Sequence, residues 1–135
     1  SDWKKVSFDL LVERADYISL HVHLGPETSG MISTREFNLM RRQPFLINVS
    51  RAELIDRDAL LVALETEIIR GVGLDAHYLE PTEPNDPLLN RQDIFSSPHI
   101  AGSTIDSYRS TMVACIQNIQ LALARSPIAG GIGGL

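Results

Sequence analysis

The chain has 135 residues, which fits one domain, and its 44% hydrophobic and 21% charged residues are ordinary for a soluble globular protein. It carries 12 Lys and Arg against 17 Asp and Glu. The resulting net charge of −5 argues against a nucleic-acid binder and gives no attraction to anionic membranes. No apolar run approaches the roughly 18 residues of a membrane span, and the first ten residues do not resemble a signal peptide. The one cysteine, Cys115, cannot form an internal disulfide, so we expect a reducing, cytoplasmic location.

The first half of the chain predicts two strands with a helix between them. Residues 15–24 are β-forming and almost continuously apolar, which indicates a strand that is covered on both faces. Residues 33–43 predict a short helix, with Ser33 as an N-cap and Glu36 placed for a capping box. Residues 44–50 predict a second strand.

The second half continues the alternation of strands and helices. It predicts a helix capped by Asp56 over residues 55–66, a third strand over 68–79, a proline-rich loop over 80–90, a fourth short strand over 94–100, and a long helix with an apolar stripe over 103–125. Such alternation requires crossover connections, which predict an α/β fold: a parallel sheet of about four strands flanked by helices. We expect one domain over residues 1–125 and a flexible glycine-rich tail over 126–135.

Three polar residues lie at the carboxyl ends of three predicted strands. Arg51 follows the second strand, Glu80 lies just past the third and His99 ends the fourth, and ligands of open parallel sheets bind outside the carboxyl ends of the strands. A guanidinium binds a carboxylate with two hydrogen bonds, and an imidazole transfers protons near neutral pH. A carboxylate beside an imidazole fixes its tautomer and favours its charged form. The three side chains together suit reduction of a 2-oxo acid, with Arg51 holding the substrate and His99, supported by Glu80, protonating the oxygen.

The stretches LINVSRAELIDRDALLVAL, GVGLDAHYLEPTEPNDPLL and SSPHIAGST resemble the second half of the cofactor-binding domain of the D-isomer-specific 2-hydroxyacid dehydrogenases. ADYISLHVHLGPETSGMI fits the same family, and the resemblance extends from about Val6 to Ala122. It implies a partial Rossmann-like, doubly wound domain, NAD(H) or NADP(H) as hydride carrier, and a small 2-oxo or 2-hydroxy acid as substrate. The family usually has Pro where this chain has His23, and Gly where it has Ala52.

The resemblance also implies roles for individual residues. Arg51, Glu80 and His99 correspond to the catalytic triad of the family, and Asp75 to the residue that bonds the nicotinamide carboxamide. The residues implied to bind the cofactor are His21, Val22, His23, Thr28, Val49, Ser50, Arg51, Asp75, His99, Ala101 and Gly102.

The sequence contains no G-x-G-x-x-G motif after a strand, the motif that cradles a dinucleotide pyrophosphate. We therefore expect about half of a cofactor domain, with weak activity or none on its own. In the usual strand order 3-2-1-4-5-6, loss of the first three strands bares one edge of the strand at residues 15–24. This predicts a homodimer that forms through the exposed sheet edge or through an exchanged helix.

Two other functions remain open. The chain could be a non-catalytic dimeric remnant or binding module, which the missing phosphate-binding loop favours. A metal-dependent hydrolase is also conceivable, because His21 and His23 lie on one side of a strand and Asp75 and His77 follow another. We expect no metal, because the family resemblance accounts for His21 and Asp75, and we interpret His77 as structural. The sequence does not identify the 2-hydroxy acid or decide between NAD and NADP.

Overall fold

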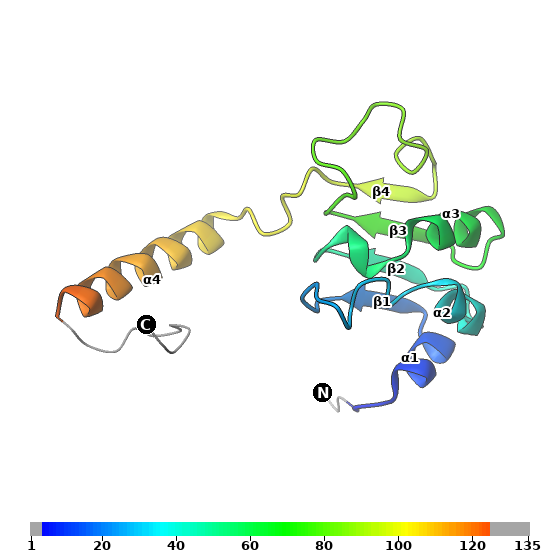
Figure 1. Cartoon of the computed structure of the whole chain (residues 1–135), viewed down its shortest axis with the longest axis horizontal. Coiled ribbons are helices and arrows are strands. Elements are labelled where there is room, and N and C mark those ends of the chain that lie inside the picture. Colours follow the sequence, from blue (N-terminus) through cyan, green and yellow to red (C-terminus); the bar gives the residue numbers. More distant parts are fainter. Residues whose placement is uncertain (1–3, 125–135) are drawn as a thin grey trace. The chain divides into compact units, whose positions relative to one another are not determined.

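A computed structural model describes residues 4–124 of the chain (Figure 1). Its contacts divide the chain into two units, Ser1–Ile100 and Ala101–Leu135, and each unit is described separately below. The tail predicted over residues 126–135 lies outside the described residues. The single domain predicted over 1–125 stays a prediction.

The first unit is built on four parallel strands: β1 (Tyr17–Leu20), β2 (Phe45–Asn48), β3 (Gly71–Leu74) and β4 (Ile94–Ser96). They are hydrogen-bonded in the order β1-β2-β3-β4, which confirms the predicted α/β fold with a parallel sheet (Figure 1). Each strand is shorter than the sequence predicts. In the register, Leu20 pairs with Asn48, Asn48 with Leu74, and Leu74 with Ser96. The carboxyl ends of all four strands therefore lie along one edge of the sheet.

Three α-helices and one short 3-10 helix belong to the same unit: α1 (Phe8–Arg14), α2 (Thr34–Leu39), η1 (Ala52–Leu54) and α3 (Arg57–Glu65). The two predicted caps are confirmed. The backbone N–H of Ser33 donates to Glu36 Oε2 over 3.0 Å, and the N–H of Ala59 donates to Asp56 Oδ1 over 2.8 Å. Both helices that these caps start precede strands of the sheet, so local capping helps to place the crossover connections.

Helix α1 is absent from the sequence prediction. Its signal is Ser7, whose Oγ accepts the N–H of Leu10 over 3.4 Å, together with Asp9 in the first turn. Helix α2 also differs from the prediction, because it ends at Leu39 rather than at residue 43. The residues after Leu39 instead lead into β2.

The core of this unit lies between the helices and one face of the sheet. Alternate strand residues such as Ile18, Leu46 and Val72 are buried there together with Phe37 of α2 and Leu60 of α3. The period of two in burial is that of a sheet with one covered face. The expectation that residues 15–24 are covered on both faces is therefore wrong within residues 4–100.

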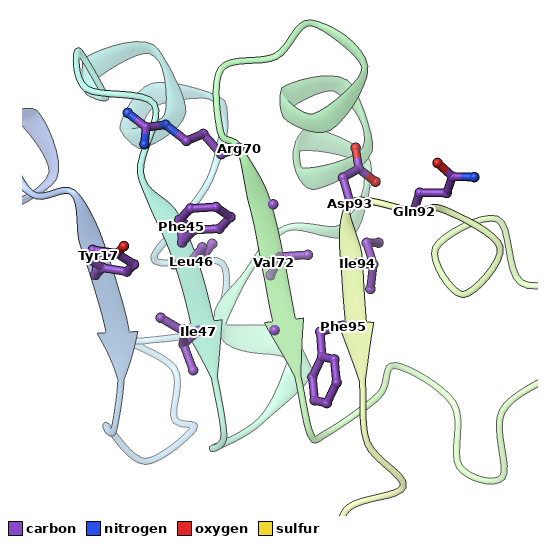
Figure 2. A pocket seen from close by; sticks show the side chains of 12 residues that line it. Tyr17, Phe45, Leu46, Ile47, Arg70, Val72, Gln92, Asp93, Ile94 and Phe95 are labelled. Atoms are coloured by element: carbon purple, nitrogen blue, oxygen red, sulfur yellow. The ribbon is translucent and has the colours of Figure 1, made fainter.

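The opposite face of the sheet carries exposed aromatic side chains (Figure 2). Tyr17 and Phe95 are 70% and 77% exposed, and the Tyr17 and Phe45 rings stack with their centroids 5.7 Å apart. Gly71 and Gly73 of β3 lie between the aromatic residues of β2 and β4, so the face is hollowed into a shallow depression of about 640 Å³. No helix covers this face within the described residues of the first unit.

The described part of the second unit is dominated by helix α4 (Ile105–Leu123), which confirms the predicted long helix. Thr104 caps it by accepting the N–H of Ser107 at Oγ1 over 3.1 Å. None of its side chains is buried, and Cys115 is exposed rather than packed in a core. Across residues 4–124, no helix combines the length and apolar character needed to cross a membrane.

The two glycines of β3 allow a matched test of packing on the sheet. A Cβ on Gly71 would lie 2.7 Å from the backbone oxygen of Asp93 and 3.4 Å from the Phe45 ring, whereas a Cβ on Gly73 would meet nothing closer than Ile47 at 4.0 Å. We expect Gly71→Ala to lower the free energy of unfolding by about 1–3 kcal/mol, as overpacking does. Gly73→Ala should be neutral or slightly stabilising, because glycine weakens a strand. Urea unfolding of both variants checks this, and equal effects would contradict the packing described.

Candidate active site

The turn after β2 is shaped by a buried amide. Asn48 is fully buried; its Nδ2 donates to the Arg51 carbonyl over 2.7 Å, and its Oδ1 accepts the N–H of Ser50 over 3.1 Å. These bonds turn the chain so that the Arg51 side chain is exposed at the carboxyl edge. Ala52, the position where the related family usually has glycine, is buried and is not among the described residues with positive φ. Its methyl group therefore introduces no backbone strain beside Arg51.

The guanidinium of Arg51 makes one hydrogen bond, from Nη1 to the carbonyl of Ser50 over 2.8 Å. Within residues 4–124 no carboxylate lies within ion-pair distance of it. By contrast, the guanidinium groups of Arg35, Arg42 and Arg57 each pair with a carboxylate. Arg51 is thus an exposed cation at the carboxyl edge with donors left for an anion.

The loop after β1 is tied to the turn after β2. Ser50 Oγ donates to the Val22 carbonyl over 2.6 Å, and Thr28 Oγ1 donates to the His23 carbonyl over 2.7 Å. Val22 and Val49 are each 40% exposed. Adjacent strand ends therefore present apolar surface beside polar backbone groups, a mixture that suits a flat ring bearing an amide.

Glu80 and His99 form a direct pair. Nδ1 of His99 lies 2.9 Å from both Oε1 and Oε2 of Glu80, and both side chains are about two-fifths exposed. Because an ionised carboxylate only accepts hydrogen bonds, Nδ1 carries the proton and Nε2 remains as the nitrogen that exchanges protons with a ligand. The structure thus joins two of the three residues predicted as catalytic. No hydrogen bond or ion pair links Arg51 to this pair in the described part of the chain.

The backbone of His99 is in the left-handed region, with φ of 54°. Residues other than glycine adopt this conformation rarely, although histidine does so more readily than most. Such a conformation costs on the order of 1–3 kcal/mol and persists only where the surroundings fix it.

Asp75 is buried and supplies part of that fixation. Its Oδ1 accepts Ser97 Oγ over 2.6 Å and the N–H of Ile100 over 2.9 Å. The carboxylate that ends β3 therefore clamps the segment that carries His99. The sequence analysis considered Asp75 as a cofactor contact and, in the alternative function, as a metal ligand, and did not predict this clamp.

His77 also lies at this site, although the sequence analysis interpreted it as structural. Its backbone N–H donates to Glu80 Oε1 over 3.0 Å, and its Nε2 lies 3.0 Å from the Ser97 carbonyl. The hydrogen bond from His77 is the largest cause that holds the pKa of Glu80 below its ordinary value, followed by the hydrogen bond from His99. These side chains line a cavity of about 320 Å³ formed by His77, Glu80, Pro81, Thr82, Ser96, Pro98 and His99.

Three further predicted positions are His21, Ala101 and Gly102. His21 bonds Ser19 Oγ through Nε2 over 2.8 Å, and Ala101 and Gly102 belong to the second unit. Among the described residues, no group of three or more His, Cys, Asp or Glu side chains could hold a metal ion. The chemistry present at the carboxyl edge of the first unit is an acid–base pair and an exposed guanidinium.

Residues 1–101 match the family described as D-isomer specific 2-hydroxyacid dehydrogenase, NAD binding domain. The chain belongs to this family. It is 37% identical over 123 residues to a glyoxylate reductase of Korarchaeum cryptofilum, covering 91% of this chain and 37% of that protein. The chain thus spans little more than a third of this curated relative.

Two solved dehydrogenases show the same fold. The NAD-complexed D-isomer specific 2-hydroxyacid dehydrogenase of Lactobacillus delbrueckii ssp. bulgaricus matches with a TM-score of 0.81 and 28% identity, covering 90% of this chain and 41% of that one. The enzyme of Xanthobacter autotrophicus Py2 in complex with NADPH and MES matches with a TM-score of 0.79 and 26% identity, covering 89% and 49%. The family and the Rossmann-like fold inferred from the sequence are therefore confirmed.

The titration of Glu80 reports directly on this site. A carboxyl whose pKa is lowered in the folded state stabilises the fold above its ordinary pKa, and this contribution is lost as the pH falls through the lowered value. We expect the Glu80 carboxyl carbon, followed by NMR, to titrate at a lower pH than the glutamate of an unstructured model peptide. In His99→Gln the pKa of Glu80 should rise only partway, because the bond from His77 remains. Titration of Glu80 at the same pH as the peptide would contradict the geometry.

Proposed function

We propose that this chain forms the acid–base part of an NAD(P)-dependent oxidoreductase that interconverts a D-2-hydroxy acid and a 2-oxo acid. The observation that carries the proposal is the contact between His99 Nδ1 and the Glu80 carboxylate, 2.9 Å long and located beside a cavity at the carboxyl edge of a parallel sheet. Membership of a dehydrogenase family supports it.

The substrate acid needs a counter-charge, and Arg51 can supply it. Its guanidinium is exposed and pairs with no carboxylate of the described chain, so its fork is available for a carboxylate. Held in this way, a 2-oxo acid has its carbonyl next to a positive charge, which polarises the bond that is to be reduced. Arg51 is exposed at the end of β2, so substrate binding is compatible with the local fold.

Proton transfer is the task of His99. A bound nicotinamide cofactor supplies the hydride that is added to the carbonyl carbon. The carbonyl oxygen takes the proton of His99 Nε2, which yields the hydroxy acid and leaves the imidazole neutral with its Nδ1–H still bonded to Glu80. In the reverse direction, Nε2 removes the hydroxyl proton. Glu80 keeps the ring orientation and tautomer constant in both directions.

The cofactor fits the carboxyl edge of the sheet at its nicotinamide end. The residues that would hold it there are Val22, Val49 and Ser50, which combine exposed apolar surface with polar groups, and Asp75, a buried carboxylate that can accept from an amide. His21, His23, Thr28, Ala101 and Gly102 remain proposed cofactor contacts by family resemblance. A glycine-rich pyrophosphate cradle is absent from the sequence. We therefore propose weak binding and slow turnover, or none, for these 135 residues alone.

Turnover by the chain tests this function with matched variants. We expect slow reduction of glyoxylate with NADH or NADPH, followed by cofactor absorbance at high protein concentration. His99→Gln should lower kcat by about 10²- to 10⁴-fold, the usual contribution of a general acid. Arg51→Met should raise KM by about 10- to 100-fold, because hydrogen bonds to charged groups are worth about 1.5–3 kcal/mol.

Arg41→Met provides the control, because Arg41 is exposed and precedes the amino end of β2, whereas the site lies at the carboxyl ends of the strands. It should leave kcat and KM unchanged. Turnover that survives His99→Gln would reject the proposed acid. If isothermal titration detects neither NADH nor NADPH binding at millimolar concentration, the alternative of a non-catalytic binding module is favoured. The exposed aromatic residues on the open face of the sheet would suit such a module.

We also propose that the chain self-associates through the free edge of β1. Strand β1 pairs with β2 on one side only, and its outer backbone groups have no strand partner within the described residues. Unpaired strand edges are templates for pairing with another chain. An exchanged helix remains the alternative route to the same homodimer.

The exposed thiol of Cys115 is consistent with the cytoplasmic location that we infer.

Sedimentation at high micromolar concentration should show a dimer. A charge on an edge strand blocks pairing, so Ser19→Lys should shift the equilibrium toward monomer. Val62→Lys adds the same charge to an exposed position of α3 and should leave the dimer intact. A monodisperse monomer, or equal effects of both substitutions, would exclude assembly through this edge.

A further inference from the structure

His77 makes hydrogen bonds to two different segments of the chain. Its backbone N–H donates to Glu80 Oε1, and its ring nitrogen Nε2 lies 3.0 Å from the Ser97 carbonyl and 3.3 Å from Ser96 Oγ. Because a carbonyl oxygen only accepts hydrogen bonds, Nε2 of His77 must carry the proton. One residue after β3 is thereby bonded both to the acidic loop and to the segment that follows β4.

The two groups that accept hydrogen bonds from His77 also accept hydrogen bonds from His99. Glu80 Oε1 accepts from the N–H of His77 and from Nδ1 of His99. The Ser97 carbonyl accepts from the ring of His77 and from the backbone N–H of His99, which donates to it over 2.9 Å. The side chain and the backbone of His99 are therefore each attached to a group that His77 also holds.

The left-handed backbone of His99 explains why such support is needed. A conformation that costs on the order of 1–3 kcal/mol is retained only if its surroundings exclude the alternatives. Asp75 holds the same segment through Ser97 Oγ and the N–H of Ile100. That clamp does not include the Ser97 carbonyl, which accepts from His99 within the segment and from the ring of His77 outside it.

We propose that His77 is a positioning residue, which holds the Glu80 carboxylate through its backbone and the Ser97 carbonyl through its imidazole, and so fixes the orientation and tautomer of His99. The inference rests on the proposed function of His99 as the general acid. His77 itself is not the acid, because the proton on its Nε2 is engaged by the Ser97 carbonyl. Its lowering of the pKa of Glu80 supports the same arrangement.

Three variants separate this role from simple packing. His77→Phe keeps a ring of similar size and removes the Nε2–H donor. His77→Gln retains a side-chain N–H that can reach the Ser97 carbonyl, and so serves as the conservative rescue. Tyr78→Phe removes a side-chain donor from the next residue of the loop, whose hydroxyl donates to the Ile55 carbonyl over 2.8 Å, and serves as the matched control.

The first readout is kinetic. His77→Phe should lower kcat by about 10- to 100-fold with KM nearly unchanged, because a small displacement of a catalytic group has effects of this size. It should also alter the pH profile of kcat. His77→Gln should recover most of the rate, and Tyr78→Phe should match the original protein.

The second readout does not depend on turnover. NMR of the ring nitrogens of His99 should show the Nδ1–H tautomer in the original chain, in His77→Gln and in Tyr78→Phe. In His77→Phe it should show a mixture of both tautomers, with faster hydrogen exchange at the His99 amide. If His77→Phe does not fold, His77→Met removes the same donor with a flexible side chain and is judged by the same outcomes.

The two hypotheses fail in different ways. If His99→Gln abolishes turnover while His77→Phe keeps kcat, pH profile and tautomer, His77 has no positioning role and the proposed function stands. If turnover survives His99→Gln or is undetectable in every variant, the tautomer of His99 decides. A pure Nδ1–H tautomer in His77→Phe then overturns the inference, and a mixture supports it.

Discussion

The parallel register of the strands is the constraint on which the site depends. At the carboxyl ends of β2, β3 and β4, Asn48 pairs with Leu74, and Leu74 pairs with Ser96. The residues that follow each of them must therefore leave the sheet along the same edge. Residues separated by almost fifty positions, such as Arg51 and His99, emerge at the same edge from β2 and β4, which β3 separates, without any local signal that would bring them together.

The segment from Asp75 to Glu80 converts that register into a specific geometry. Asp75 clamps the chain after β4, and Glu80 binds the imidazole of His99. His77 contacts both the Glu80 carboxylate and the Ser97 carbonyl. Six residues thus provide the fixed surroundings for a histidine that comes from a different strand. In contrast, Arg51 is placed by Asn48 in the turn after β2 and depends on none of these contacts. Proton transfer and substrate binding are therefore supported by separate parts of the fold.

The sequence predicts the parts of this structure that depend on local chemistry. The caps at Ser33 and Asp56 and the alternation of strands and helices follow from side chains and spacing within a few residues. Helix α1 was missed, although Ser7 gave a usable capping signal. The open face of the sheet was also missed, because an apolar strand has the same composition whether or not a helix covers its second face.

The candidate site divides in the same way. Family resemblance pointed to Glu80 and His99, and their 2.9 Å contact agrees with it. The double contact of His77 could not be predicted, because it depends on how two irregular loops fold against each other. The structural role of Asp75 was hidden for the same reason: its partners are Ser97 and Ile100, which lie more than twenty residues away.

The left-handed φ of His99 limits how this protein could change its chemistry. Asparagine and aspartate tolerate this backbone more readily than most residues but carry no imidazole, whereas β-branched residues would be strained in it. A replacement must therefore suit the left-handed backbone as well as supply a group that transfers a proton. At this position, the shape of the main chain restricts which side chains evolution or protein engineering can introduce.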